Sequence, residues 1–392
     1  MLNKELQVSI IDEDDNGNGV FKKDGLVGFV KGALKGEELL VLVADVKKRF
    51  IKARVVKVLK PSLKRKKVVC DKFYECGGCN FLHVDSQFEN ECKYNYIKSL
   101  FHEYNVKPII SSNLLHYRNK VTFHVRDNRL AYFEEDSHDV VFIDNCALVN
   151  PIINDMINHI NKLDLSNVSS VLIRVSETTG EVMTRFSGNV FIDSIKKYCD
   201  SIYIDDKLIY GNPYITENIN GILFTIYPDS FFQVNTSMMI KLYEVVKEYT
   251  SCGNSLLDLY CGTGTIGIYL KDNFKNVFGV EINESSIKNA NLNKKLNSIK
   301  NCEFLLGDSK TIVNNCYDVV VVDPPRSGLS KNVINNLLEM KSNKIIYVSC
   351  NPKTLKRDIE LLENKYYVKE ITPVNMFYRT SHVECVSILE RK

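Results

Sequence analysis

The sequence predicts an α/β protein with a C-terminal Rossmann-like domain, a small N-terminal OB-like β-barrel and a central α+β domain. From about residue 235, short apolar runs alternate with helical stretches, which is the pattern of a doubly wound parallel sheet. Residues 1–60 hold β-branched runs broken by turn sequences such as DEDDNGNG, which favours a small barrel. Short strands dominate residues 117–225, and a helix is expected over 150–163.

The length of 392 residues exceeds what one hydrophobic core supports. We expect a barrel over 1–60, a central domain over 70–225 and a Rossmann-like domain over 226–392. Apolar runs stay below the roughly 18 residues that a membrane helix needs, and the N-terminus is too acidic for a signal peptide. These features predict a cytoplasmic protein with no membrane partner, in which the 12 cysteines are reduced.

Positive charge is concentrated in the N-terminal part of the chain. Residues 1–69 carry 16 Lys and Arg against 9 Asp and Glu, although the whole chain has a net charge of only +3. Between Lys47 and Lys67 there are 11 basic residues and no acidic one. Such a segment favours a polyanionic partner, and small barrels often bind oligonucleotides. The alternative is a solvated basic surface without a ligand.

A glycine-rich turn follows the predicted strand Leu256–Tyr260. Gly262 and Gly264 belong to a G-x-G-x-x-G pattern that opens a helix, and Glu281 ends the next strand 19 residues after Gly262. An acid at that position suits the ribose hydroxyls of a nucleoside cofactor. Because NAD and S-adenosylmethionine share this ribose, the motif does not distinguish them. A tight turn without a ligand is the alternative.

Two further acids end predicted strands of the same sheet. Asp308 follows the third strand and suits the exocyclic amine of adenine, although a surface turn explains it on spacing alone. Asp323 begins Asp323–Arg326, whose two prolines fix the backbone and hold the acid at the strand end. A dehydrogenase has no use for this rigid acidic corner. The motif therefore favours methyl transfer from S-adenosylmethionine.

The sequence Ser-Cys-Asn-Pro at Ser349–Pro352 ends the fifth strand and offers Cys350 as a nucleophile. C5 of uracil is unreactive until a thiolate adds to C6, and C5 then attacks an activated methyl group. This chemistry requires a partly exposed thiol with a lowered pKa. Glu384 begins the last strand and is the candidate general base, with His382 in a local orienting role. The alternatives are a core cysteine and a surface glutamate.

Closely spaced cysteines precede the central domain. Cys70, Cys76 and Cys79 surround a Gly-Gly pair, and either Cys92 or Cys146 is available as a fourth ligand. Soft thiolates at this spacing suit zinc or an iron–sulfur cluster. The absence of a second C-x2-C argues against an ordinary zinc ribbon. Incidental cysteines are the alternative.

Taken with the Phe-Phe-Gln-Val-Asn sequence at Phe231–Asn235, these motifs resemble the bacterial RNA 5-methyluridine methyltransferases over nearly the whole chain. The closest resemblance is to the branch that acts on 23S ribosomal RNA. It implies that the first domain is a TRAM domain, that Cys350 is the nucleophile and that Glu384 is the base. It also implies that Phe231 stacks on RNA. The segment Tyr117–Lys120 resembles a family segment that faces RNA, and an ordinary strand start is the alternative.

The resemblance also assigns the ligand sites. S-adenosylmethionine contacts are implied for Gln233, Tyr260, Glu281, Asp308 and Asp323, together with the glycine turn. A [4Fe–4S] cluster is implied on the first three cysteines and on a fourth about 70 residues further on. This spacing favours Cys146 over Cys92.

The cysteines favour 23S ribosomal RNA as the substrate, with transfer RNA as the alternative and no DNA partner. Because methyl transfer moves no net electrons, the cluster is expected to serve structure or RNA contact. Two alternatives to RNA methyl transfer also fit parts of the sequence. The glycine turn with Glu281 also fits an NAD-dependent oxidoreductase, and the basic barrel also fits a non-catalytic RNA-binding protein.

Overall fold

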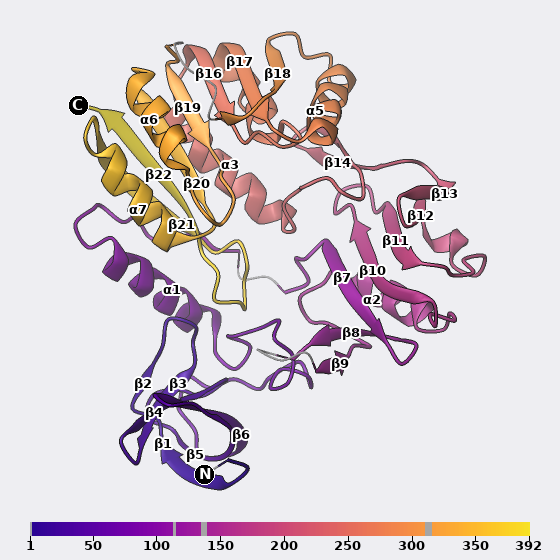
Figure 1. Ribbon diagram of the computed structural model, residues 1–392, viewed down its shortest axis with the longest axis vertical. Coiled ribbons are helices and arrows are strands. Elements are labelled where there is room, and N and C mark those ends of the chain that lie inside the picture. Colours follow the sequence, from indigo (N-terminus) through magenta and orange to yellow (C-terminus); the bar gives the residue numbers. More distant parts are fainter. Residues whose placement is uncertain (1, 113–114, 135–138, 310–315) are drawn as a thin grey trace.

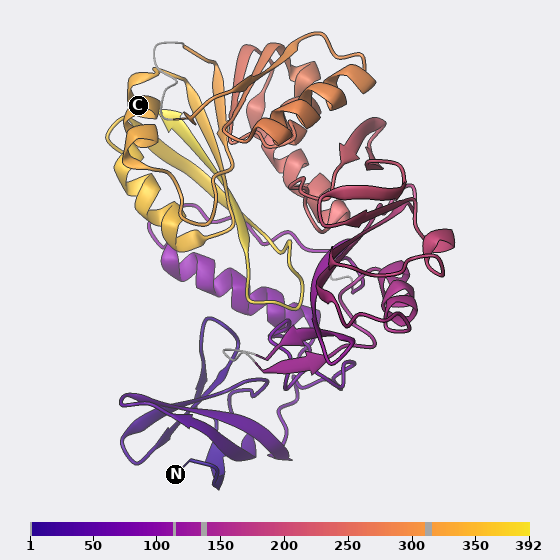
Figure 2. The ribbon, with the colours of Figure 1, turned by 45° about the vertical axis from the view of Figure 1, so that its right-hand side comes forward.

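The computed structural model describes residues 2–112, 115–134, 139–309 and 316–392. The N-terminal sheet lies at one end of the molecule and the C-terminal sheet at the other, with the central sheet on one side between them (Figures 1 and 2). The α/β class and the Rossmann-like C-terminal domain predicted from the sequence are confirmed. No helix in the described ranges has the length and apolar character needed to cross a membrane.

The N-terminal sheet is built around a small apolar core. Phe21, Leu39 and Ile51 are fully buried there, and Gly28 leaves room for the Phe21 ring, which a Cβ at that position would approach to 2.1 Å. The strand order is β1-β5-β6-β4-β3-β2. The strands are β1 Glu5–Ser9, β2 Asp12–Glu13, β3 Gly19–Lys23, β4 Leu26–Val30, β5 Glu38–Val46 and β6 Phe50–Lys60.

The central sheet has the order β13-β12-β11-β10-β7-β8-β9 and carries one helix on one face. That helix, α2 Pro151–Ile160, confirms the helix predicted over 150–163, and it buries Ile153 and Ile157 against the sheet. The strands are β7 Lys120–Arg126, β8 Arg129–Phe133, β9 Val140–Phe142, β10 Val168–Val175, β11 Val182–Gly188, β12 Ser201–Ile204 and β13 Lys207–Gly211, with the 3-10 turn η1 Lys196–Tyr198. A hairpin of β14 Ile215–Ile219 and β15 Ile222–Ile226 leads into the next domain.

The C-terminal sheet has the order β18-β17-β16-β19-β20-β22-β21. Its strand β19 reads Val-Val-Val-Val and is wholly buried, as expected for a parallel strand covered on both faces. The strands are β16 Gly253–Leu259, β17 Phe274–Glu281, β18 Cys302–Leu306, β19 Val319–Val322, β20 Lys344–Ser349, β21 Tyr366–Val374 and β22 Glu384–Arg391. The helices are α3 Thr236–Thr250, α4 Thr265–Tyr269, α5 Glu284–Leu296, α6 Lys331–Glu339 and α7 Pro352–Leu362, with the turn η2 Lys271–Asn273.

One detail of this sheet differs from the sequence-based expectation. The last two strands are not parallel: β22 inserts between β20 and β21 and runs antiparallel to both. The connection over 375–383 contains no helix, and a parallel crossover needs a dozen or more residues. The helix expected between β18 and β19 falls mostly on residues 310–315, which lie outside the described residues.

Helix α1, Ser86–Leu100, packs with the C-terminal sheet although the sequence assigns it to the central domain. Ile97 and Phe101 are fully buried in the core that includes β20 and β22. Residues 105–110 then run along β21, where the Lys107 N–H donates to the Ile371 carbonyl over 2.9 Å. The burial of this segment therefore depends on partners more than 200 residues away in the chain.

Candidate active site

The acids predicted to bind a cofactor follow neighbouring strands of the C-terminal sheet. Strands β18, β17, β16 and β19 are parallel neighbours, so their carboxyl ends lie along one edge (Figure 1). Glu281 ends β17, Asp323 directly follows β19, and Asp308 comes two residues after β18. Tyr260 directly follows β16. The structure therefore brings these four residues to the same edge, as the sequence predicts.

The glycine turn after β16 has left-handed backbone at several positions. Tyr260, Gly262 and Gly264 have φ values of 62°, 53° and 78°. A Cβ on Gly264 would meet the Phe304 ring at 2.7 Å, so this position requires glycine, whereas a Cβ on Gly262 would meet nothing within 4 Å. The Gly262 N–H donates to Glu281 Oε2 over 3.2 Å. The turn is thus packed tightly at Gly264 and leaves space for a ligand at Gly262.

Asp258 lies beneath this turn and is a residue that the sequence analysis missed. Its Oδ2 accepts the Gly267 N–H over 2.9 Å, and its Oδ1 has no hydrogen-bond partner in the described structure. Burial raises the pKa of this carboxyl to about 8. The sequence signal for Asp258 is its position within an apolar strand, because burying an acid there costs free energy unless the acid has a role.

The central sheet holds the segment that contains Gln233. Asn119 donates from its N–H to the Val234 carbonyl over 2.9 Å and from its side chain to the Gln233 carbonyl over 3.2 Å. The fully buried Arg174 donates to the Ser230 carbonyl over 3.0 Å. Gln233 itself is buried. These bonds fix a segment at the junction of the two domains.

Cys350 and Glu384 lie on neighbouring strands at one end of the sheet. Ser349 pairs with Cys385 across β20 and β22, so the residue after Ser349 lies beside the residue before Cys385. Glu384 is only 4% exposed, and burial, aided by the nearby Asp323, raises its pKa to about 8. Burial likewise raises the pKa of Asp323 to about 7. The predicted nucleophile, base and loop acid therefore lie close together.

The pKa of the Cys350 thiol differs from the sequence-based expectation. Burial raises it to about 11, and Glu384 and Asp323 contribute in the same direction, while Arg326 opposes them. The expected lowered pKa is therefore wrong, because burial, together with two nearby acids, disfavours the thiolate. Partial exposure of the thiol is confirmed.

Arg326 is a further residue close to Cys350 and Glu384, and the sequence analysis did not select it. Its carbonyl accepts the Asn351 side-chain amide over 3.0 Å, which ties the loop after β19 to the loop after β20. Its charge lowers the pKa of the thiol of Cys350 and of the carboxyl of Glu384. The sequence signal that could have identified Arg326 is its position directly after the two prolines, where the backbone is rigid.

The four predicted cysteine ligands line one cavity of about 520 Å³. Cys70, Cys76, Cys79 and Cys146 all contribute to its wall, whereas Cys92 lies in a separate apolar cluster beside Phe81 and Val84. Burial raises the pKa of the Cys70 and Cys76 thiols, and the nearby Cys146 adds to this. Among the described residues, no three His, Cys, Asp or Glu side chains are grouped so that they could hold a metal ion.

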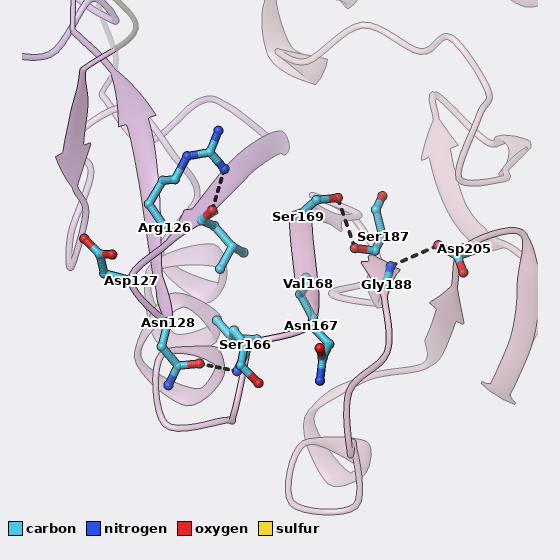
Figure 3. Close-up of a pocket in the computed structure, with 12 residues that line it drawn as sticks. Arg126, Asp127, Asn128, Ser166, Asn167, Val168, Ser169, Ser187, Gly188 and Asp205 are labelled. Carbon is cyan, nitrogen blue, oxygen red and sulfur yellow. Dashed lines mark hydrogen bonds between the residues drawn. The ribbon is translucent and has the colours of Figure 1, made fainter.

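A cavity of about 560 Å³ at the far end of the central sheet contains none of the residues that the sequence predicts (Figure 3). Arg126 and Asn128 line it from the β7–β8 turn, and Ser169, Gly188 and Asp205 line it from the other strands. Arg126 lies six residue steps along β7 from Lys120, or about 20 Å of strand. This cavity is thus remote from the Gln233 end of the sheet.

Comparison with known proteins agrees with this geometry. The family model for tRNA (Uracil-5-)-methyltransferase matches residues 202–310 and 309–392. An uncharacterised RNA methyltransferase from Enterococcus faecalis is 34% identical, and the match covers 99% of this chain and 98% of that protein. Another from Caldanaerobacter subterraneus is 31% identical, with 100% and 99% covered.

A solved structure extends the likeness to the whole fold. Pyrococcus abyssi tRNA (uracil-54, C5)-methyltransferase, in complex with S-adenosyl-L-homocysteine, aligns with a TM-score of 0.81 and 29% identity, covering 98% of this chain and 99% of that one. The chain therefore belongs to the RNA (uracil-5-)-methyltransferase family and is an RNA methyltransferase.

Proposed function

We propose that this enzyme transfers the methyl group of S-adenosylmethionine to C5 of a uridine in 23S ribosomal RNA, through a covalent adduct between Cys350 and C6. The observation that carries the proposal is the pairing of β20 with β22, which sets Cys350 beside Glu384. A nucleophile and a buried carboxyl with a pKa near 8 are the two groups that the reaction needs.

The steps balance in atoms and protons. The Cys350 sulfur bonds to C6 as its proton leaves, and C5 gains the electron density of the former double bond. C5 then attacks the methyl carbon, whose bond to the sulfonium sulfur breaks. Glu384 removes the C5 proton, the C5–C6 double bond returns and the bond from C6 to Cys350 breaks, so that the sulfur leaves as a thiolate and takes back the proton that it lost. Each turnover releases one proton and the unmethylated donor.

The edge formed by β16 to β19 is the proposed binding site for S-adenosylmethionine. Glu281 would hold the ribose hydroxyls, Asp308 the adenine amine, and Gln233, Tyr260 and Asp323 the remaining parts of the molecule. The proposal is supported by the open side of the turn at Gly262 and Gly264. The solved relative from Pyrococcus abyssi contains the demethylated product of the same cofactor.

A [4Fe–4S] cluster on Cys70, Cys76, Cys79 and Cys146 is part of the proposal. Its support is the cavity of about 520 Å³ that all four thiols line, together with the preference of iron–sulfur clusters for thiolates. A cluster of eight atoms holds its ligands further apart than one zinc ion does, so the spread of the sulfurs around a cavity suits it. Burial raises the thiol pKa values, and bonding to iron would offset this cost of ionising the thiols.

The N-terminal sheet is proposed to be a TRAM domain that guides RNA to the active site. A groove of about 930 Å³ is lined by basic residues of this sheet and by His382, which lies two residues before Glu384 in the sequence. Its wall includes Lys47, Phe50 and Lys52. Cations with an aromatic ring suit a single RNA strand, because phosphates and bases are both contacted.

The central sheet offers a second surface for the same RNA. Helix α2 covers one face, while Lys120, Thr122, His124 and Arg126 alternate on the other and are partly or fully exposed. Phe231, at the junction with the C-terminal domain, is 66% exposed and is proposed to stack on a base. These residues extend the proposed RNA path toward the pocket of Cys350.

Transfer RNA is the second candidate substrate. The observation that favours it is the likeness over the whole chain to a transfer-RNA enzyme, at a TM-score of 0.81. The four-cysteine cavity favours ribosomal RNA, since the resemblance places such cysteines in the ribosomal branch.

Mapping 5-methyluridine in both RNAs from a deletion strain separates the two candidates. Loss of a ribosomal 5-methyluridine, restored by the intact gene and not by Cys350→Ala, is the expected result. Loss confined to transfer RNA would assign the second candidate. Unchanged 5-methyluridine in both RNAs would contradict the function itself.

A further inference from the structure

The loop over 375–383 leads from β21 directly to Glu384, and the segment after Cys79 holds it. The N–H groups of Asn80 and Phe81 both donate to the Arg379 carbonyl, over 2.8 and 3.1 Å. The Ser381 N–H donates to Asn80 Oδ1 over 3.0 Å. A residue adjacent to a predicted cluster ligand thus fixes the backbone three residues before the proposed base.

Helix α1 supplies a second anchor through Glu89, which is fully buried. Its carboxylate accepts the Lys93 ammonium over 2.8 Å, the Asn375 amide over 3.1 Å and the Arg379 N–H over 2.9 Å. The Lys93 ammonium also donates to Asn375 Oδ1 over 2.7 Å and to the Phe377 carbonyl over 3.3 Å. A buried network of this kind tolerates little displacement, because removing one partner leaves a buried charge unpaired.

Arg379 itself is held in an unusual conformation. Its φ of 70° is in the left-handed region, which a non-glycine residue adopts only where its surroundings impose it. Its guanidinium reaches back to the carbonyls of Phe81 and Val84, over 2.9 and 2.8 Å. Both the backbone and the side chain of Arg379 therefore lock the loop onto the residues that follow Cys79.

A third contact joins the loop to the cysteine cavity. The Tyr117 hydroxyl donates to the Tyr378 carbonyl over 3.0 Å. Tyr117 and Tyr378 form one apolar cluster, against which Cys79 and Cys146 pack. The cavity wall and the loop that precedes Glu384 thus share side chains as well as backbone bonds.

We propose that Asn80, Glu89 and Arg379 are positioning residues that set the place of Glu384, and that the four-cysteine centre acts on catalysis through them. The inference rests on the proposed role of Glu384 as the base. The proposal gives the four-cysteine centre a function that needs no electron transfer. A well-ordered conformation of residues 70–84 holds residues 375–383 in a single conformation.

Glu89→Gln tests the anchor, with Glu91→Gln as the matched control. Glu91 is exposed on the same helix and accepts a hydrogen bond from the Gln87 side chain. In Glu89→Gln we expect faster amide hydrogen exchange over 375–383 and a kcat lower by about 10- to 100-fold, because small displacements of reacting groups have effects of that size. Affinity for S-adenosylmethionine should stay unchanged, since its proposed ligands lie on other strands.

Equal exchange and equal kcat in the two variants would overturn the proposal. If Glu89→Gln fails to fold, Asn80→Ala serves instead, because it removes a single bond to the Ser381 N–H. It should give the same pattern with a smaller effect, and unchanged exchange over 375–383 would count against the anchor.

The link to the cysteines has a separate readout. Protein reconstituted with iron and sulfide is compared with Cys79→Ser, and hydrogen exchange over 375–383 is measured without RNA or cofactor. Faster exchange in Cys79→Ser supports the link, and equal exchange contradicts it. Since exchange does not depend on Glu384 acting as a base, failure of the proposed chemistry would leave this result standing.

Discussion

Ser349 and Cys385 are register partners in the antiparallel ladder of β20 and β22, and this pairing sets Cys350 beside Glu384. The two side chains come from segments 34 residues apart in sequence. Each reaches the pocket at the end of its own strand, so neither depends on a long flexible loop. Because of this proximity, Glu384 adds to the rise that burial causes in the pKa of the Cys350 thiol. The geometry leads to two predictions about the chemistry.

Cys350→Ala should abolish methyl transfer. Loss of a nucleophile lowers turnover by at least about a thousand-fold in enzymes whose catalytic groups act as a unit. RNA containing 5-fluorouridine should form a covalent complex with the native enzyme, since fluorine cannot leave C5 as a cation, and no complex with the variant. Gel mobility under denaturing conditions measures this. Cys252→Ala, at an exposed cysteine, is the control and should form the complex normally.

Glu384→Gln should stop the reaction after methylation, because the amide cannot take the C5 proton. We expect a covalent enzyme–RNA adduct with ordinary RNA, detected by mass spectrometry as the chain plus methylated RNA. In the native enzyme the single-turnover rate should rise as pH increases toward about 8, since the carboxyl must be ionised to act as base. Glu390→Gln, on the same strand, should turn over without accumulating adduct.

Local sequence signals predicted the elements that bear the cofactor edge. Alternation of apolar runs and helices located β16 to β20, and the glycine turn fixed Gly262 and Gly264, because strand burial and left-handed backbone are properties of short segments. Packing between distant segments was not predictable in this way. The docking of α1 on the C-terminal sheet and the antiparallel insertion of β22 depend on partners far along the chain.

Electrostatics in the pocket was the least predictable part of the site. The raised pKa of Cys350 follows from the presence of Glu384 and Asp323 around a buried thiol, in addition to burial itself. Sequence analysis identified all three residues but not the effect of the two acids on the pKa of the thiol. Arg326 was overlooked for the same reason, since its influence appears only when the loops after β19 and β20 meet.

Glu281→Gln should weaken binding of S-adenosylmethionine. The carboxylate accepts the N–H groups of Gly262 and Asn283, and we expect it to accept the ribose hydroxyls as well. Replacing one charged hydrogen-bond acceptor costs about 1.5–3 kcal/mol, or roughly 10- to 100-fold in affinity. Calorimetric titration measures the change. Glu284→Gln, exposed on α5, should bind normally, and equal affinities in the two variants would remove Glu281 from the site.

Asp258→Asn should alter how stability depends on pH. The folded pKa of Asp258, about 8, lies above its unfolded value of about 3.9, so the folded state holds its proton more tightly. This contribution to stability is complete below pH 4 and is lost as pH rises toward 8. Asparagine keeps an acceptor for the Gly267 N–H and does not ionise.

The stability of Asp258→Asn relative to the native chain should therefore improve between pH 5.5 and 8.5, as measured by urea unfolding. Glu384 and Asp323 also have raised pKa values, so only the difference between the two proteins reports on Asp258. Asp272→Asn, at an exposed site, should show no such pH-dependent difference. A constant difference for Asp258→Asn would mean that this carboxyl ionises normally.

Replacing Lys47 and Lys52 together by Gln should weaken RNA binding in a salt-dependent way. Both line the groove that leads toward His382, and each phosphate contact contributes about 0.7 to the slope of log affinity against log salt for a single strand. We expect the slope to become shallower by about 1.4, while kcat at saturating RNA stays unchanged. RNA-binding titrations at salt concentrations from about 50 to 200 mM measure this slope, because the salt effect is large in that range.

Lys22→Gln with Lys23→Gln provides the matched control for this groove. These lysines are exposed on β3 of the same sheet and are not part of the groove wall. The double substitution makes the same change in net charge, so any effect of overall charge appears equally in both variants. A shallower slope only in the groove variant locates the RNA path between the basic strands and the pocket of Cys350. Equal slopes in the two variants would instead mean that the basic sheet attracts RNA only through its overall charge.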